Sequence, residues 1–162
     1  MATLTVWKFT TPNGAEQAER TLLDLQKQKL ITVHDAATVS WEQGRKKPKT
    51  RQLKSLTGSG ALGGSFWGLL FGLIFFVPLL GVAVGAGLGA LAGSMSDVGI
   101  DDRFIKDVRD QVTPGTSALF VLTSGAVQDK VRDAFAGQRP QLISTNLSHE
   151  QEAALREAFA EE

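Results

Sequence analysis

Side chains of the kinds that catalyse reactions or bind metals are few in this sequence. Cysteine and tyrosine are absent, and histidine occurs only at His34 and His149. His34 and Asp35 are neighbours that can form a hydrogen-bonded pair, but no nucleophile motif accompanies them. A metal site would need ligands that two isolated histidines do not supply. We therefore expect no catalytic residues, no metal and no cofactor, and we predict that the protein is not an enzyme.

One glycine motif has the form of a nucleotide-binding loop. Gly58-Ser59-Gly60-Ala61-Leu62-Gly63 matches the dinucleotide pattern letter for letter. That pattern requires a preceding strand and an acidic residue about 20 positions later, where this chain has apolar residues and glycine. A phosphate-binding loop requires lysine followed by serine or threonine, where Gly64-Ser65 stands. Nucleotide binding is therefore not predicted.

The chain is organised around residues 55–96, which contain no Asp, Glu, Lys, Arg or His. Two sets of glycines, each spaced by four, lie on either side of Pro78: Gly60, Gly64, Gly68 and Gly72, then Gly81, Gly85, Gly89 and Gly93. Residues four apart share one face of a helix, so each set forms a groove that another backbone can approach closely. Pro78 lacks an N–H and disfavours helix at the residue before it, which predicts a turn. The pattern predicts a glycine-zipper helical hairpin.

The lengths of the two arms favour a membrane. Residues 57–76 would form a helix of about 30 Å and residues 79–95 one of about 25 Å, at roughly 1.5 Å per residue. In water each glycine would cost roughly 1 kcal/mol relative to alanine. We expect a transmembrane hairpin in the cell membrane, and the alternative is a hairpin buried between protein subunits. Residues 1–10 lack the pattern of a signal peptide, so both termini are expected in the cytoplasm.

A basic cluster precedes the apolar stretch. It consists of Arg45, Lys46, Lys47, Lys49, Arg51 and Lys54. Such a cluster is typical of the cytoplasmic flank of a membrane segment, where it can contact anionic headgroups. The alternative is a solvated hairpin edge kept from aggregating by its lysines. The formal net charge of the chain is zero, so nucleic acid is not an expected partner.

The flanks of the apolar stretch alternate between strand and helix patterns. Residues 4–9 and 31–41 are predicted strands around a helix at 15–29, and 46–53 a short strand that returns as a hairpin. In the strand at 31–41, Val33, Ala37 and Val39 are expected on one face. Trp7 and Trp41 are expected either in the core or in a contact between copies.

The second flank repeats the pattern. A linking helix is predicted at 102–112, strands at 117–124 and 141–147 around a helix at 126–136, and a last helix at 152–160. Two βαβ units predict an α+β, ferredoxin-like fold with the hairpin inserted. The predicted division is 1–54 (first half and basic hairpin), 55–96 (apolar hairpin) and 97–162 (linking helix, second half and C-terminal helix).

Several segments carry a family resemblance. They include residues 56–64 and 66–72, Pro78-Leu79-Leu80-Gly81, residues 85–92, residues 97–102, residues 114–120 and residues 152–158. On these motifs the chain resembles the DUF1269 family of bacterial membrane proteins of unknown function, over nearly its whole length. The resemblance implies membrane association and brings no activity or catalytic residues.

The leading functional prediction is a membrane-associated homo-oligomer with a structural or envelope-stress role. Its glycine-zipper hairpins would pack together in the bilayer, and its α/β domain would lie in the cytoplasm. One alternative is a pore-forming or transport-related oligomer, although few polar side chains are available to line a pore. The other alternative is a water-soluble, self-assembling particle with its hairpins buried between subunits. The expected partners are further copies of the chain and the lipid bilayer.

Overall fold

A computed structural model describes residues 2–28, 33–52, 67, 70–76, 100, 102–124, 128–135, 137 and 140–147. Among the predicted helix-packing glycines, only Gly72 lies within these residues. Pro78, Lys54 and the helix predicted at 152–160 lie outside them.

Both flanks of the apolar stretch contribute to one antiparallel sheet. Its strands are β1 (Ala2–Phe9), β2 (Val33–Ser40), β3 (Lys49–Gln52), β4 (Ser117–Ser124) and β5 (Gln141–Leu147). Their order is β3-β2-β4-β1-β5, and every neighbouring pair is antiparallel. The predicted α+β class is confirmed, and so is the short strand that returns beside β2.

The two βαβ units interleave in the sheet. β1 and β2 are connected by α1 (Gly14–Lys27), and β4 lies between them. β4 and β5 are connected through α6 (Gln128–Ala134), and β1 lies between them. This is a split βαβ arrangement. As a result, neither half of the chain builds a continuous sheet alone.

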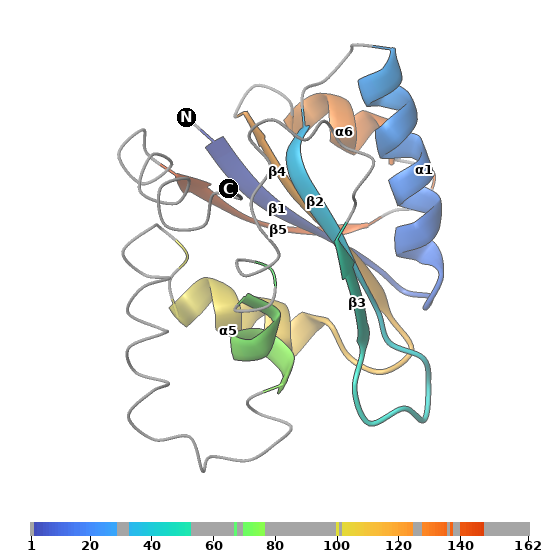
Figure 1. Ribbon diagram of the computed structural model, residues 1–162, viewed down its shortest axis with the longest axis vertical. Coiled ribbons are helices and arrows are strands. Elements are labelled where there is room, and N and C mark those ends of the chain that lie inside the picture. The colour runs from blue at the N-terminus through green and yellow to red at the C-terminus, as the bar shows by residue number, and fades with distance from the viewer. Residues whose placement is uncertain are drawn as a thin grey trace.

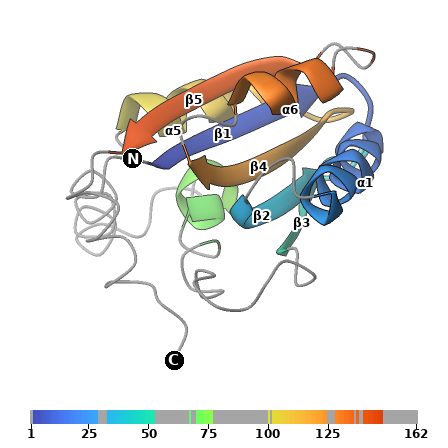
Figure 2. The ribbon, with the colours of Figure 1, turned by 90° about the horizontal axis from the view of Figure 1, so that it is seen from above.

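Helical segments cover both faces of the sheet. α1 and α6 lie on one face, while α5 (Asp102–Gln111) and η1 (Gly72–Phe76), a short π-helix, lie on the other (Figures 1 and 2). In β1, Leu4 and Val6 belong to the core under α5 and η1, whereas Trp7 and Phe9 belong to the core under α1 and α6. The side chains of β1 therefore alternate between the two cores, as expected for a strand with both faces covered.

The two tryptophans that were expected either in the core or between copies are core residues. Trp7 is 1% exposed in the α1–α6 core, and Trp41 is 8% exposed in the α5–η1 core.

The alternation predicted for the second strand is wrong at its start. Val33 packs in the core under α1, whereas Ala37 and Val39 pack in the core under α5 and η1. The pairing of β2 with β4 shifts register between Val33 and Asp35. An extra residue of this kind moves all following side chains to the opposite face. The shift therefore places Asp35 on the face that α5 and η1 cover.

Two turns are joined at one end of the sheet. The Trp41 N–H donates to the Thr116 carbonyl at 2.9 Å, and the Gly115 N–H donates to the Trp41 carbonyl at 2.7 Å. Gly115 has φ +89°, a left-handed conformation that glycine adopts without strain. These bonds fix the turn after β2 against the turn between α5 and β4.

Candidate functional site

The first arm of the predicted hairpin is partly built into the core of the chain. Five of its side chains are at most 3% exposed: Trp67, Leu70, Phe71, Ile74 and Phe75. They recur at intervals of three and four, so they form one stripe along a helix. All five belong to the core between the sheet and α5. These side chains were expected in lipid or between subunits, and they instead pack on the sheet of the same chain.

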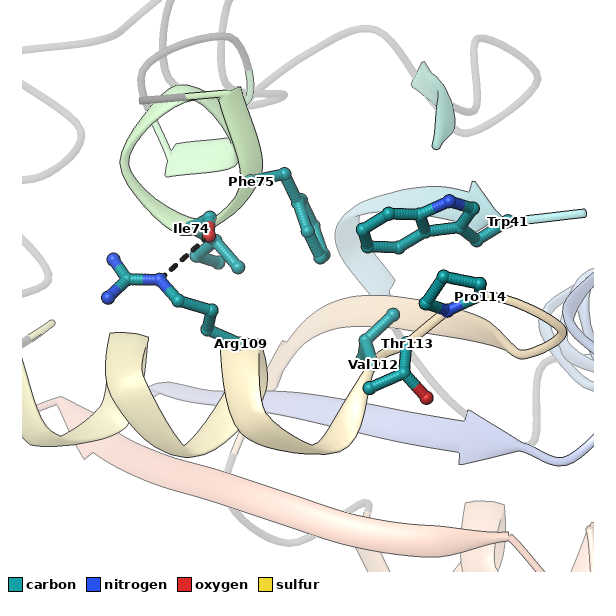
Figure 3. A pocket seen from close by; sticks show the side chains of 7 residues that line it. All are labelled: Trp41, Ile74, Phe75, Arg109, Val112, Thr113 and Pro114. Atoms are coloured by element: carbon teal, nitrogen blue, oxygen red, sulfur yellow. Dashed lines mark hydrogen bonds between the residues drawn. The ribbon is translucent and has the colours of Figure 1, made fainter. Parts of the chain in front are cut away.

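Aromatic rings join this stripe to the strands beneath it. Phe71 meets Phe120 of β4 edge to face at a centroid distance of 5.0 Å, and Trp67 stacks on Phe71 at 5.8 Å. Phe75 meets Trp41 edge to face at 6.0 Å (Figure 3). Pairs in such arrangements contribute about 0.5–1.5 kcal/mol each beyond the area that they bury.

A buried carboxylate is the first polar contact between the stripe and the sheet. Asp35 is 1% exposed, and its Oδ2 accepts a hydrogen bond from Trp67 Nε1 at 3.0 Å. Its Oδ1 accepts a bond from the Ala36 N–H at 2.9 Å. Buried carboxylates require such donors because burial removes their hydration. A hydrogen bond between His34 and Asp35 was considered from the sequence, and the side chain of His34 lies outside the described residues.

An arginine makes the second polar contact. Arg109 of α5 donates from Nε to the Ile74 carbonyl at 3.0 Å (Figure 3). Ile74 belongs to η1, and the carbonyls at the end of a helix lack donors within the helix itself. Arg109 donates to one of these carbonyls, and a positive charge near the C-terminal end of a helix is also favourable.

A small cleft opens beside this contact. Its volume is about 120 Å³, and its walls are Trp41, Ile74, Phe75, Arg109, Val112, Thr113 and Pro114. Arg109 lies at one end, and Trp41 and Pro114 lie at the other (Figure 3). The lining holds no carboxylate, imidazole or thiol that could transfer a proton or attack a substrate. Within the described part of the chain, no cluster of three or more His, Cys, Asp or Glu side chains could hold a metal ion.

The predicted basic cluster divides into paired and unpaired residues. Arg51 of β3 forms an ion pair with Glu19 of α1, and Arg45 lies 3.7 Å from Glu42. Three lysines are exposed and form no hydrogen bond or ion pair with any described residue: Lys46, Lys47 and Lys49. The unpaired lysines of the basic cluster therefore lie in the turn between β2 and β3 and at the first residue of β3.

Gly72 lies outside the buried stripe. It is half-buried, and a Cβ built on it would meet no atom of the described residues within 4 Å. The glycine groove as a whole stays a prediction, because its other members lie outside the described residues. Among the helices that the structure describes, none combines the length and hydropathy needed to cross a membrane.

The fold and these contacts define an α+β protein that packs part of an uncharged segment on its own sheet. A family model for a protein of unknown function (DUF1269) matches residues 61–160. The chain therefore belongs to the DUF1269 family. The resemblance was expected over nearly the whole chain, whereas the matched residues begin after β1, α1, β2 and β3. Comparison with curated proteins and with solved structures found no match.

Proposed function

We propose that the protein is a non-enzymatic, membrane-associated homo-oligomer with a structural or envelope-stress role. Its α/β domain holds the stripe from Trp67 to Phe75, and a later part of the apolar segment enters the bilayer and packs against other copies. The observation that carries this proposal is the contrast between two sides of one helical segment. The stripe from Trp67 to Phe75 is buried on the sheet, while Gly72 has open space beside it among the described residues.

The composition of this segment makes the contrast informative. A helix that covers a sheet in water normally carries polar residues on its outer side. Residues 67–76 read WGLLFGLIFF and contain no charged, hydroxyl or amide side chain. The side turned away from the sheet is therefore suited to apolar neighbours, which lipid or another glycine-bearing helix provides.

The sheet constrains how the segment meets the bilayer. β2 and β3 precede the apolar segment, β4 and β5 follow it, and all four belong to one sheet. In the proposed membrane-bound protein both flanks would therefore lie on the same side of the membrane. With residues 67–76 held on the domain, residues 77–96 would form a helix of only about 30 Å, enough for one crossing but not for two. The proposal is therefore a segment that enters the bilayer and returns to the same face, with both termini in the cytoplasm.

Self-association is tested by placing a large side chain on the open side of the segment. Gly72→Leu is expected to reduce the oligomer mass in detergent, measured by light scattering on a sizing column, with an unchanged circular dichroism spectrum. Gly137→Leu is the matched control, because Gly137 is exposed and a Cβ there meets no described atom within 4 Å. An unchanged mass for Gly72→Leu would count against packing through this side.

Membrane association is tested by extracting the native membrane fraction with alkaline carbonate. Retention in the pellet until detergent is added is the expected result.

A water-soluble assembly is the second candidate, and one observation favours it. The five large apolar side chains of the first arm are already sheltered from water by the sheet. Release by carbonate, together with large particles in detergent-free buffer, would select this function over the membrane-associated one.

A further inference from the structure

The apolar segment has a definite direction on the sheet. Trp67 contacts Asp35 near the beginning of β2, and Phe75 contacts Trp41 just after β2 ends. The segment therefore runs alongside β2 in the same direction and reaches the end of η1 near the turn between β2 and β3. The uncharged residues 77–96 continue the chain from this end of the domain.

The same end carries the unpaired lysines. Lys46, Lys47 and Lys49 are exposed in or beside the turn, which follows β2 in Figure 1, and the acidic residue nearest in sequence, Glu42, lies beside Arg45. The turn is held in place, because Trp41 Nε1 donates to the Arg45 carbonyl at 3.0 Å. Its backbone is further tied to the Gly115 turn through Trp41. The positive charges thus lie at the end of the sheet near which η1 ends and after which the uncharged residues 77–96 follow in the sequence.

We infer that the turn 44–49 is a docking surface for anionic phospholipid headgroups, which orients this end of the domain toward the bilayer. The inference rests on the proposed membrane association and adds its lipid class, its contact residues and its orientation. Two observations select this surface: the complementary charge of the lysines and the contact of Phe75, near the end of η1, with Trp41 beside the turn. Arg51 is assigned no part in it, because its guanidinium pairs with Glu19 of α1 on the other face of the sheet.

The expected loss of vesicle binding on removing two lysines follows from membrane electrostatics. A basic residue near an anionic surface contributes about 1 kcal/mol, so removing two lysines is expected to weaken binding about 30-fold at low salt. The loss should shrink in concentrated salt, because a surface charge is screened beyond roughly 10 Å at 0.1 M ionic strength.

The test uses the full-length protein and preformed vesicles of phosphatidylcholine with and without phosphatidylglycerol. The variant Lys46→Gln/Lys47→Gln is compared with Arg20→Gln/Lys27→Gln, which removes the same charge from exposed positions on α1. Bound fractions are measured by vesicle sedimentation over a range of lipid and salt concentrations. The turn variant is expected to bind phosphatidylglycerol vesicles about 30-fold more weakly than the α1 variant, with both alike on phosphatidylcholine.

Each other outcome has a distinct meaning. Equal losses in the two variants, or wild-type binding that ignores phosphatidylglycerol, would overturn the docking surface while membrane association stands. Absence of binding to either kind of vesicle would overturn the proposed function together with this inference. Lysine-dependent binding to duplex DNA without binding to vesicles would assign the turn to a different partner and would also overturn the inference.

Discussion

Phe71 is the residue whose removal best tests whether the apolar segment belongs to the folded domain. Its side chain is 3% exposed and lies between Trp67, Phe75 and Phe120. If the segment is packed on the sheet, Phe71→Ala opens a cavity in the core. If the segment leaves the sheet for the bilayer, the same change leaves the stability of the sheet almost unaltered.

The expected loss in the free energy of unfolding of Phe71→Ala is large enough to measure directly. Replacing a buried phenylalanine by alanine costs about 3–5 kcal/mol. Three aromatic pairs are lost with the ring, so a value near 4 kcal/mol is expected. With a urea dependence of about 2 kcal/mol per molar, the unfolding midpoint should fall by roughly 2 M.

The assay is urea unfolding, followed by far-ultraviolet circular dichroism. Every variant is measured in the same detergent or buffer. Phe135→Ala is the matched control, because Phe135 is 1% exposed in the other core and meets Trp7 edge to face at 5.3 Å. The urea midpoint is expected to fall by comparable amounts in Phe71→Ala and Phe135→Ala. A lowered midpoint for Phe135→Ala with an unchanged midpoint for Phe71→Ala would refute the packing of the segment on the sheet.

Two further predictions concern the polar contacts that hold the segment. Trp67→Phe removes the indole N–H that donates to Asp35, and a loss of about 2 kcal/mol in the free energy of unfolding by urea is expected because a buried acceptor is left without this donor. Asp35→Asn should then lower the free energy of unfolding less in the Trp67→Phe variant than in the wild type, as a double-mutant cycle would show. Arg109→Met keeps most of the side-chain stem but removes the donor to the Ile74 carbonyl, so a loss of about 1 kcal/mol is expected, measured by thermal unfolding. An unchanged melting temperature would mean that solvent replaces this bond fully.

Much of the sheet could be predicted because its patterns are local. The strand Ser117–Ser124 contains a short apolar run, and Gln141–Leu147 follows a helix pattern with a glycine beyond it. Both strands were predicted with the bounds that the structure shows. The turns at Gly44 and Gly115 are also marked locally, because glycine and proline favour turns and both glycines have positive φ.

The register shift in β2 could not be predicted in the same way. An extra residue between Val33 and Asp35 leaves no mark in the composition, since His34 is as acceptable in a regular strand as in an irregular one. The alternation rule assumes that no such residue is present. It therefore assigned Val33 and Ala37 to one face, although the structure places them in different cores.

The site was missed for a related reason. Asp35 and Trp67 are 32 residues apart, and Arg109 and Ile74 are 35 residues apart. Nothing within residues 55–96 distinguishes apolar side chains that face lipid from those that face a sheet, because both environments favour the same residues.

The interleaved order of the strands has a consequence for synthesis of the chain. β1 pairs only with β4 and β5 among the described strands, and β2 pairs with β3 and β4. The hairpin of β2 and β3 is therefore the only part of this sheet that can form before residue 117 is made. Residues 67–76 leave the ribosome roughly 50 residues ahead of the end of β4, an interval of several seconds at about 5–20 residues per second. During that interval only the hairpin of β2 and β3 is available to the stripe, and Phe120 of β4 is still missing. A nearby bilayer, a chaperone or a second nascent chain can then compete for the stripe.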